Sequence, residues 1–336
     1  MANISKIDIF TLNLIKGIGQ KSLMNLINSG YPITDLIAMD EDELGGYIKG
    51  SGKKNAIDAI HHHYSEQQEN AEKELDNLKE NDIDLITFWD DDYPFLYKEI
   101  KDPPIFLYCK GNTSLLNYKQ SIAIVGTREC SDYGRKIAFN TAEYFSGQKY
   151  NIVSGLAIGI DTAGHRGSLK SEGLTTAVLT DIHKIYPEEN IQLANTILDT
   201  NGLLLAENAP GTFPHRGLFV ARDRLQSGLS LAVFPIETDV KGGTMHTVQF
   251  AQDQNRLLFC PDLLSIPKYP NNFSKSRGVI QLINDGKAIA FSKSIYPELL
   301  DKLKKHENLL WEKSQNIEEK SQTQEQLTLK GLNDLS

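Results

Sequence analysis

The chain has 336 residues, of which 40% are hydrophobic, and its formal net charge is −9. A chain of this length is expected to hold two or three domains. No stretch reaches the roughly 20 apolar residues of a membrane helix, and Met1–Ile4 does not begin a signal peptide. The three cysteines, Cys109, Cys130 and Cys260, lie too far apart to suggest a zinc site or a disulfide framework. We therefore expect a reduced, cytoplasmic protein without a membrane segment, metal or cofactor.

Arginine is distributed unevenly along the chain. Residues 1–120 carry 12 lysines, 20 acidic residues and no arginine, whereas residues 121–260 carry seven of the eight arginines. A guanidinium binds phosphate or carboxylate through two parallel hydrogen bonds. We interpret roughly half of these arginines as partners of acidic residues within the domain. The others are expected to meet an external phosphate.

The first 80 residues predict a small helical domain. Gly-x-Gly turns occur at Lys16–Lys21 and, more weakly, at Ile48–Lys53, each between helical segments. This is the helix–hairpin–helix pattern, in which free helix amides can meet a phosphate. The acidic surroundings favour plain turns in a helical bundle instead. His61, His62 and His63 are consecutive and point in different directions on a helix, so they predict no metal site.

Residues 81–292 predict an α/β domain. A strand at Asp84–Phe88 and an apolar segment ending at Ile105–Tyr108 come first, and strands then alternate with helices. This alternation is typical of a doubly wound parallel sheet of the Rossmann-like type, which binds ligands beyond the carboxyl ends of its strands. Residues 293–336 predict one helix, about 297–312, and a polar, disordered tail. The expected strands are Ile122–Val125, Asn151–Ser154, Thr175–Leu179, Leu203–Ala206, Leu231–Pro235, Leu257–Cys260 and Ala288–Phe291.

Glycine and arginine recur where these strands end. Glycine lets the backbone approach a ligand, and the helix that follows offers unpaired amides and a positive dipole end. Several such loops at one sheet edge predict an extended surface for phosphate. The Gly-x-Gly-x-x-Gly fingerprint is missing after the first parallel strand, which argues against NAD. The candidate residues are Gly126, Thr127, Arg128, Ser154, Gly155, Gly159, Arg166, Arg222, Arg224, Lys241, Gly242, Gly243 and Thr244.

Five segments also resemble, in order and spacing, the DprA/Smf family of DNA-processing proteins. These segments are Ser121–Arg128, Ser154–Arg166, Tyr186–Asn190, Arg222–Ser230 and Gly242–Thr247. The resemblance covers about residues 10–290. It implies an extended Rossmann-like domain behind a helical domain. It also implies a homodimer that binds and protects single-stranded DNA and delivers it to a RecA-type recombinase during DNA uptake and natural transformation.

The chain departs from the family pattern at three places. The family's Gly-Ser loop is replaced by Gly242–His246. Ala221 and Asp223 reduce the positive or neutral polar character of a run that is usually basic, and residues 293–336 are too few and too polar for the winged helix that many relatives carry. The DNA-binding expectation is therefore stronger than the recombinase expectation.

Two alternatives remain open from the sequence. A Rossmann-like domain of this kind could instead sense a small nucleotide-derived ligand, because both ligands need a phosphate cradle. A nucleotide phosphoribohydrolase would carry a carboxylate near its Gly-Gly loop, but none follows Gly242 within that turn. Asp161 is expected to cap the next helix, and Glu207 has no evident partner. We therefore predict a binding protein rather than an enzyme.

Overall fold

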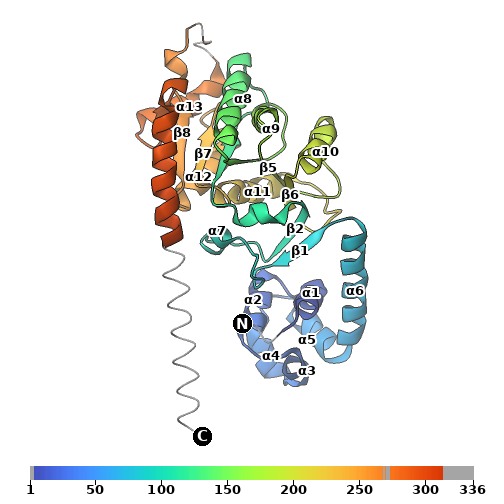
Figure 1. Ribbon diagram of the computed structural model, residues 1–336. Helices are drawn as coiled ribbons and strands as arrows, with labels where there is room; N and C mark the ends of the chain where they lie inside the picture. Colours follow the sequence, from blue (N-terminus) through green and yellow to red (C-terminus); the bar gives the residue numbers. More distant parts are fainter. Residues whose placement is uncertain (1–3, 268, 270–272, 313–336) are drawn as a thin grey trace. The chain divides into compact units, whose positions relative to one another are not determined.

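A computed structural model describes residues 4–267, 269 and 273–312 of the chain. The chain divides into two compact units (Figure 1). The first comprises residues 1–93 and 104–109, and the second comprises residues 94–103 and 110–336. The domain boundaries expected from the sequence stay a prediction, and the polar tail at 313–336 lies outside the described residues. None of the helices in the described ranges has the length and hydrophobicity of a membrane-spanning segment.

The first unit is a helical bundle followed by a strand pair. Strand β1 runs antiparallel to β2, with Leu85 opposite Tyr108. Gly17 has a φ of +104°, and a Cβ there would collide with the backbone of Gly52. The two predicted Gly-x-Gly turns therefore pack directly against each other, and glycine is required for this approach. The elements are α1 (Lys6–Leu14), α2 (Gln20–Asn28), α3 (Ile33–Ala38), α4 (Glu41–Tyr47), α5 (Lys53–His62), α6 (Tyr64–Glu80), β1 (Asp84–Thr87) and β2 (Phe106–Gly111).

The second unit is built on a parallel sheet with the strand order β6-β5-β4-β3-β7-β8-β9. This confirms the predicted Rossmann-like α/β class. The strands are β3 (Ser121–Val125), β4 (Asn151–Ser154), β5 (Thr175–Leu179), β6 (Leu203–Ala206), β7 (Ala232–Pro235), β8 (Leu257–Pro261) and β9 (Ile289–Phe291). The helices are α7 (Phe95–Lys98), α8 (Asp132–Gly147), α9 (Ile160–Lys170), α10 (Ile191–Asp199), α11 (Arg216–Gly228), α12 (Thr244–Asp253) and α13 (Arg277–Asn284).

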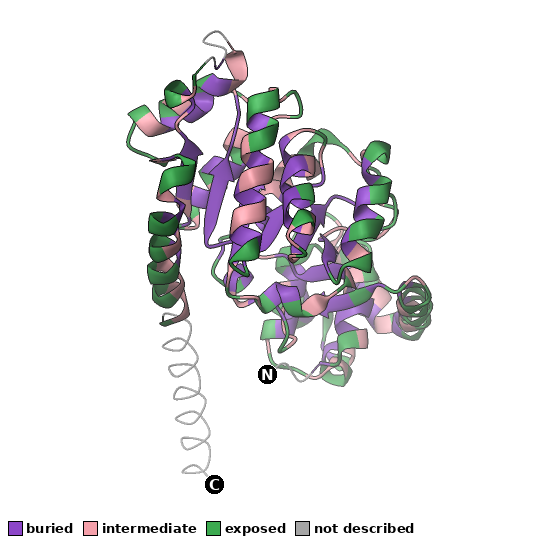
Figure 2. Cartoon of the chain, turned by 45° about the horizontal axis from the view of Figure 1, so that its top comes forward, coloured by how far each residue is buried: buried purple, intermediate pink, exposed green. Residues whose placement is uncertain are grey.

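Helices cover both faces of this sheet, so strands such as β3 and β7 are buried along their whole length (Figure 2). This explains why the strands are continuous apolar runs rather than alternating ones. The core includes Phe145, Phe234 and Phe259. The last described helix, residues 296–312, contributes Tyr296 and Leu303 to the same core, so it packs on the second unit.

The strand order reverses direction between β3 and β7. From β3 the chain proceeds to β4, β5 and β6 on one side, whereas β8 and β9 follow β7 on the other side. The segments that follow the carboxyl ends of β3 and β7 therefore lead to opposite sides of the sheet, and a crevice forms between them. The amide of Thr127 donates to the carbonyl of Glu237 at 2.8 Å and joins the two strand ends at the base of this crevice.

Candidate nucleic-acid interface

A cavity of about 350 Å³ occupies the predicted place, at the carboxyl ends of β3 and β7. We call it the switch-point cavity. Its walls come from the loop after β3, the start of α9, helix α11, and the loop that leads from β7 into α12. The residues that line it are Val125, Gly126, Thr127, Arg128, Glu129, Ala157, Asp161, Arg216, Phe219, Val220, Arg222, Asp223, Gln226, Thr238, Asp239, Gly242, Gly243, Thr244, His246, Thr247 and Lys275.

The structure brings some of the predicted site residues together at this cavity and places others elsewhere. Ser154 is fully buried, and its hydroxyl donates to the Ile124 carbonyl at 2.6 Å. Arg166 and Lys241 are exposed and do not line the switch-point cavity. The predicted residues that do line the switch-point cavity are Gly126, Thr127, Arg128, Arg222, Gly242, Gly243 and Thr244.

Gly155 and Gly159 do not line the cavity but fix the loop beside it. Gly159 has a φ of +87°, and a Cβ there would lie 2.5 Å from the Thr127 carbonyl oxygen and 2.7 Å from that of Arg128. A Cβ at Gly155 would overlap the Arg222 guanidinium. Both glycines are therefore needed for close packing between protein groups at this edge of the sheet.

Asp161 organises the loop between β4 and α9. The N-cap of α9 is Gly159, so the expectation that Asp161 caps this helix is wrong. Its carboxylate instead accepts hydrogen bonds from the amides of Gly155 at 3.1 Å and Ala157 at 3.3 Å. The sequence analysis expected the amides of this loop to be available to a phosphate, but the amides of Gly155 and Ala157 already donate to this carboxylate. Burial raises the pKa of Asp161, and the charge of Arg222 opposes that rise.

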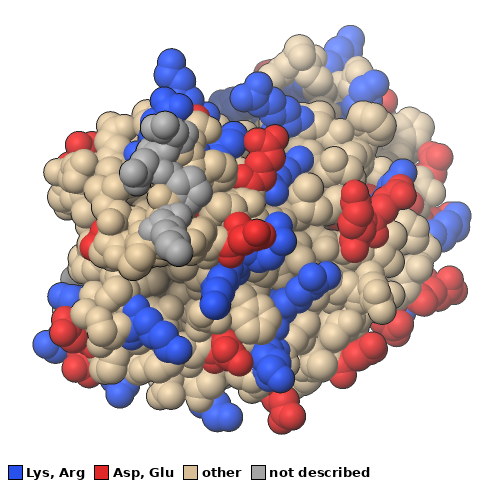
Figure 3. All heavy atoms as spheres, turned by 90° about the horizontal axis from the view of Figure 1, so that it is seen from above, with Lys and Arg blue, Asp and Glu red and all other residues tan. Residues whose placement is uncertain are grey.

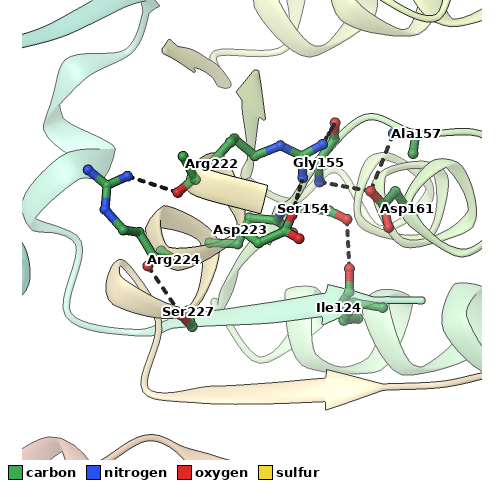
Figure 4. Close-up of polar contacts among 11 residues, drawn as sticks. Ile124, Ser154, Gly155, Ala157, Asp161, Arg222, Asp223, Arg224 and Ser227 are labelled. Atoms are coloured by element: carbon green, nitrogen blue, oxygen red, sulfur yellow. Dashed lines mark hydrogen bonds and ion pairs between the residues drawn. The ribbon is translucent and has the colours of Figure 1, made fainter. Parts of the chain in front are cut away.

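Arg222 lies at the wall of the cavity rather than at an exposed rim. It is 7% exposed, donates to the Gly155 carbonyl at 3.3 Å and pairs with Asp223 at 3.3 Å (Figure 4). Burial raises the pKa of Asp223 to about 6, even though the charge of Arg222 lowers it. His165 is also buried, and its own burial together with the charge of Arg222 lowers its pKa to about 3. The Nδ1 atom of His165 lies 2.7 Å from the Thr175 hydroxyl.

Arg224 lies two residues farther along α11 and extends in the opposite direction from Arg222 (Figure 4). Its guanidinium makes two parallel hydrogen bonds to the Glu207 carboxylate, at 2.7 and 2.5 Å. Burial lowers the pKa of Arg224, but the hydrogen bonds and charge of Glu207 outweigh this effect and the pKa is raised. Arg224 does not line the cavity, and Glu207 has the partner that the sequence did not reveal.

The exposed positive charge at the cavity comes from Arg128 and Arg216. Both are exposed and both line the cavity, and within the described ranges neither forms an ion pair. The Arg128 guanidinium lies 5.6 Å from the centre of the Phe219 ring. Lys275 also lines the cavity, but it pairs with Glu129 at 3.4 Å. Arg128 and Arg216 are therefore the cations with charge available to an anion.

Comparison with known proteins places this geometry in a family. Residues 84–304 match the model of the DNA recombination-mediator protein A family. The chain belongs to that family. The DprA/Smf resemblance predicted from the sequence is thus confirmed.

Individual relatives agree with this assignment. The chain is 33% identical to the DNA processing protein DprA of Bacillus subtilis over 271 residues, which are 80% of this chain and 84% of the relative. It is 35% identical to the protein Smf of Synechocystis, over 66% of this chain and 54% of that protein. The crystal structure of DprA from Streptococcus pneumoniae superimposes with a TM-score of 0.68 and 26% identity, covering 85% of this chain and 94% of that one.

A second solved structure comes from DNA processing protein A of Helicobacter pylori and describes a single-stranded DNA binding mode of that protein. It superimposes with a TM-score of 0.54 and 29% identity, covering 68% of this chain and 96% of that one. The family core is therefore shared in sequence and in fold.

Acidic residues distinguish the cavity of this family member from a purely basic cradle. The lining contains Glu129, Asp161, Asp223 and Asp239 beside its four basic residues. The face seen from above likewise shows lysine and arginine side chains interspersed with acidic ones (Figure 3). The potential at this face is consequently mixed, and the exposed cations matter more than the net charge.

Sequence reasoning missed Arg216, which lines the cavity, and Glu237, which holds the elements beside it. Arg216 was not among the predicted site residues; it is the first residue of α11, and nine residues separate it from the end of the preceding strand, β6. Glu237 is fully buried and accepts hydrogen bonds from the Ser131 amide at 2.8 Å and from the Tyr269 hydroxyl at 2.6 Å. It thereby holds the start of α8 against the end of β7. Its position two residues after the end of β7 was the available signal.

Proposed function

We propose that this family member binds single-stranded DNA and holds the phosphate backbone at the mouth of the switch-point cavity. The observation that carries the proposal is the pair of exposed arginines, Arg128 and Arg216, at the crevice where the strand order reverses. Helix α12 also begins there, at Thr244, so the positive end of its dipole faces the same place.

The distribution of charge within the cavity supports a backbone held at its mouth. Asp161 is buried and Asp223 is partly buried in the wall, where they would repel a phosphate that entered deeply. A polyanion is better accommodated along the exposed arginines. Phosphate contacts of this kind carry no sequence information, so weak sequence preference is part of the proposal. A single strand is flexible enough to reach both arginines and a helix terminus, so we expect it to bind better than duplex.

The relatives support the wider assignment. The Helicobacter pylori protein is described as binding single-stranded DNA, and family members are named as DNA-processing proteins or recombination mediators. The proposal also includes that the protein forms a homodimer, protects the strand and delivers it to a RecA-type recombinase. It further includes a cytoplasmic location. A role as a binding protein rather than an enzyme is included, because the acidic groups Asp161 and Asp223 are engaged by loop amides and Arg222.

A small nucleotide-derived ligand is the second candidate. The volume of about 350 Å³ falls in the range of small-ligand sites. Two buried atoms of lining residues, Nε of Arg222 and Oε1 of Gln226, have no hydrogen-bond partner among the described residues. A polar group inside the cavity would satisfy such a donor and acceptor.

One binding experiment separates the two candidates. The affinity for a labelled single-stranded oligonucleotide is measured in competition with mononucleotides and with blunt duplex of equal length. The proposal predicts that the oligonucleotide binds most tightly and that its affinity falls steeply with salt. Preferential binding of a mononucleotide supports the sensor instead, and preferential binding of duplex contradicts both.

A further inference from the structure

Two turns of the first unit repeat the same sequence pattern and the same backbone conformation. Residues 16–21 and 49–54 both read Lys-Gly-x-Gly-x-Lys. The first glycine of each turn, Gly17 or Gly50, lies in the left-handed region, with φ values of +104° and +105°. Helices α2 and α5 begin directly after the second glycine of their turn. The proposed function assigns no role to either turn.

The two turns lie side by side. A Cβ on Gly17 would lie 2.4 Å from the Gly52 carbonyl oxygen, and a Cβ on Gly52 would lie 2.6 Å from the Gly17 Cα atom. The Lys49 amide also donates to the Ser22 hydroxyl at 3.0 Å, which joins the second turn to the start of α2. The lysines of both turns are therefore gathered in one region of the first unit. We call them the lysine patch: Lys16, Lys21, Lys49 and Lys54.

The lysine patch carries positive charge that other side chains do not neutralise. All four side chains are exposed, and none forms an ion pair within the described ranges. The half-buried Lys53 adds a further charge, because its Nζ would lie 2.4 Å from a Cβ on Gly45. Neither turn contains an acidic residue, whereas four lie in Asp40–Glu43 and six lie along α6. The acidic surroundings noted in the sequence therefore do not extend into the turns.

These features indicate a polyanion that has two equivalent backbones. Lysine presents a compact charge on a flexible stem, so it suits phosphates that are held without a fixed orientation. The two backbones of a DNA duplex are equivalent and antiparallel, so two equivalent turns can each meet one of them. A single strand offers only one backbone. Going beyond the proposed function, we infer that the lysine patch is a second nucleic-acid site, which binds phosphates on both strands of duplex DNA without reading its sequence.

This second site should be the weaker of the two. Sequence-independent binding of duplex DNA typically has a Kd of about 10⁻⁶ to 10⁻⁴ M at physiological salt. Duplex binding at the lysine patch is therefore compatible with tighter binding of a single strand at the switch-point cavity.

The test uses the full-length chain and a blunt labelled duplex at low salt. Lys16→Ala/Lys49→Ala removes the first lysine of each turn. Losing two phosphate contacts should reduce the log–log salt slope for duplex by about 1.8 and weaken duplex binding by roughly tenfold or more. The affinity of this double variant for a labelled single strand should equal that of the wild type. Arg128→Ala should show the reverse, with duplex binding kept and single-strand binding weakened.

Lys73→Ala/Lys79→Ala is the matched control. It removes the same charge from exposed positions on α6, in the same unit but outside both turns. The control should keep the wild-type duplex affinity and slope. If thermal melting shows that Lys16→Ala/Lys49→Ala does not fold, Lys21→Ala/Lys54→Ala replaces it, with the same expectation.

Different results would overturn different statements. Wild-type duplex affinity and slope in the folded double variant would show that the lysine patch is not a duplex site. An equal loss in the control would also overturn the inference, because it would reflect net charge alone. An equal loss for duplex and single strand would overturn it as well. If the wild-type protein binds the single strand but no duplex, the second site is wrong and the proposed function stands. If it binds duplex but no single strand, the proposed function fails, and the double variant still decides the second site.

Discussion

Replacing Arg128 with alanine removes one of the two exposed cations at the switch-point cavity. The guanidinium forms no ion pair with any described residue. It lies over the face of Phe219, and its charge opposes the rise that burial causes in the pKa values of Asp161 and Asp223. A hydrogen bond to a charged group contributes about 1.5–3 kcal/mol, so we expect Arg128→Ala to weaken single-stranded DNA binding by roughly tenfold or more. Losing one phosphate contact should also reduce the log–log salt slope by about 0.7.

The folded state should be affected far less than binding. An exposed cation–π contact contributes about 0.5–1 kcal/mol. For a unit of this size, that corresponds to a decrease in Tm of roughly 2–4 °C. Arg128→Lys keeps the charge but not the planar fork, so it should recover only part of the lost affinity.

The assay is fluorescence anisotropy of a labelled strand across a salt series, combined with thermal melting of each variant. Arg166→Ala is the matched control, because Arg166 is exposed on α9 and does not line the switch-point cavity. The control should keep the wild-type affinity and slope. Wild-type affinity and slope in folded Arg128→Ala would refute the reasoning, and equal losses in both variants would show that the assay reports only overall charge.

Three further predictions follow from the same surroundings. The pKa of Asp223 is about 6, so lowering the pH from about 7.5 to 5.5 should neutralise it and strengthen DNA binding by roughly fivefold. Asp223→Asn should bind tightly at both pH values, and a variant with the full wild-type pH dependence would contradict this. Arg224→Ala leaves Glu207 unpaired at 15% exposure, so it should destabilise folding by about 3 kcal/mol in denaturant titrations without changing the salt slope. Gly159→Ala places a side chain at a φ of +87° against the Thr127 carbonyl, so it should cost about 1–3 kcal/mol of stability, and an unchanged Tm would show that the loop relaxes.

The stability of the Asp223 region should depend on pH in a defined direction. Its pKa in the folded chain lies above the ordinary value of 3.8, so the folded state favours the neutral carboxyl. The stability associated with that neutral form is present at low pH and is lost as the pH rises from about 4 to about 6. Asp223→Asn should therefore gain stability relative to the wild type above about pH 6, as measured by thermal melting.

The sequence by itself determined the α/β class, the order of the strands along the chain and the edge at which the cavity lies. Runs such as Ile122–Val125 are apolar throughout, and only a parallel sheet covered on both faces accounts for several of them in alternation with helices. The loop residues Gly126, Arg128 and Gly242 then had to gather at the carboxyl ends of those strands. The local sequence pattern was sufficient to locate the cavity, because the strands and their parallel direction determine that their carboxyl ends meet at one edge of the sheet.

Only the tertiary structure decided what each polar side chain contacts. Arg222 and Arg224 are two residues apart in one helix and so point to different sides, but the helix alone does not indicate which side borders the cavity. Glu207 and Asp161, which are distant in sequence from these arginines, turned out to engage Arg224 and the amides beside Arg222. Such pairs depend on the packing of α11 against neighbouring loops, and a carboxylate competes with phosphate for the same guanidinium and amide donors.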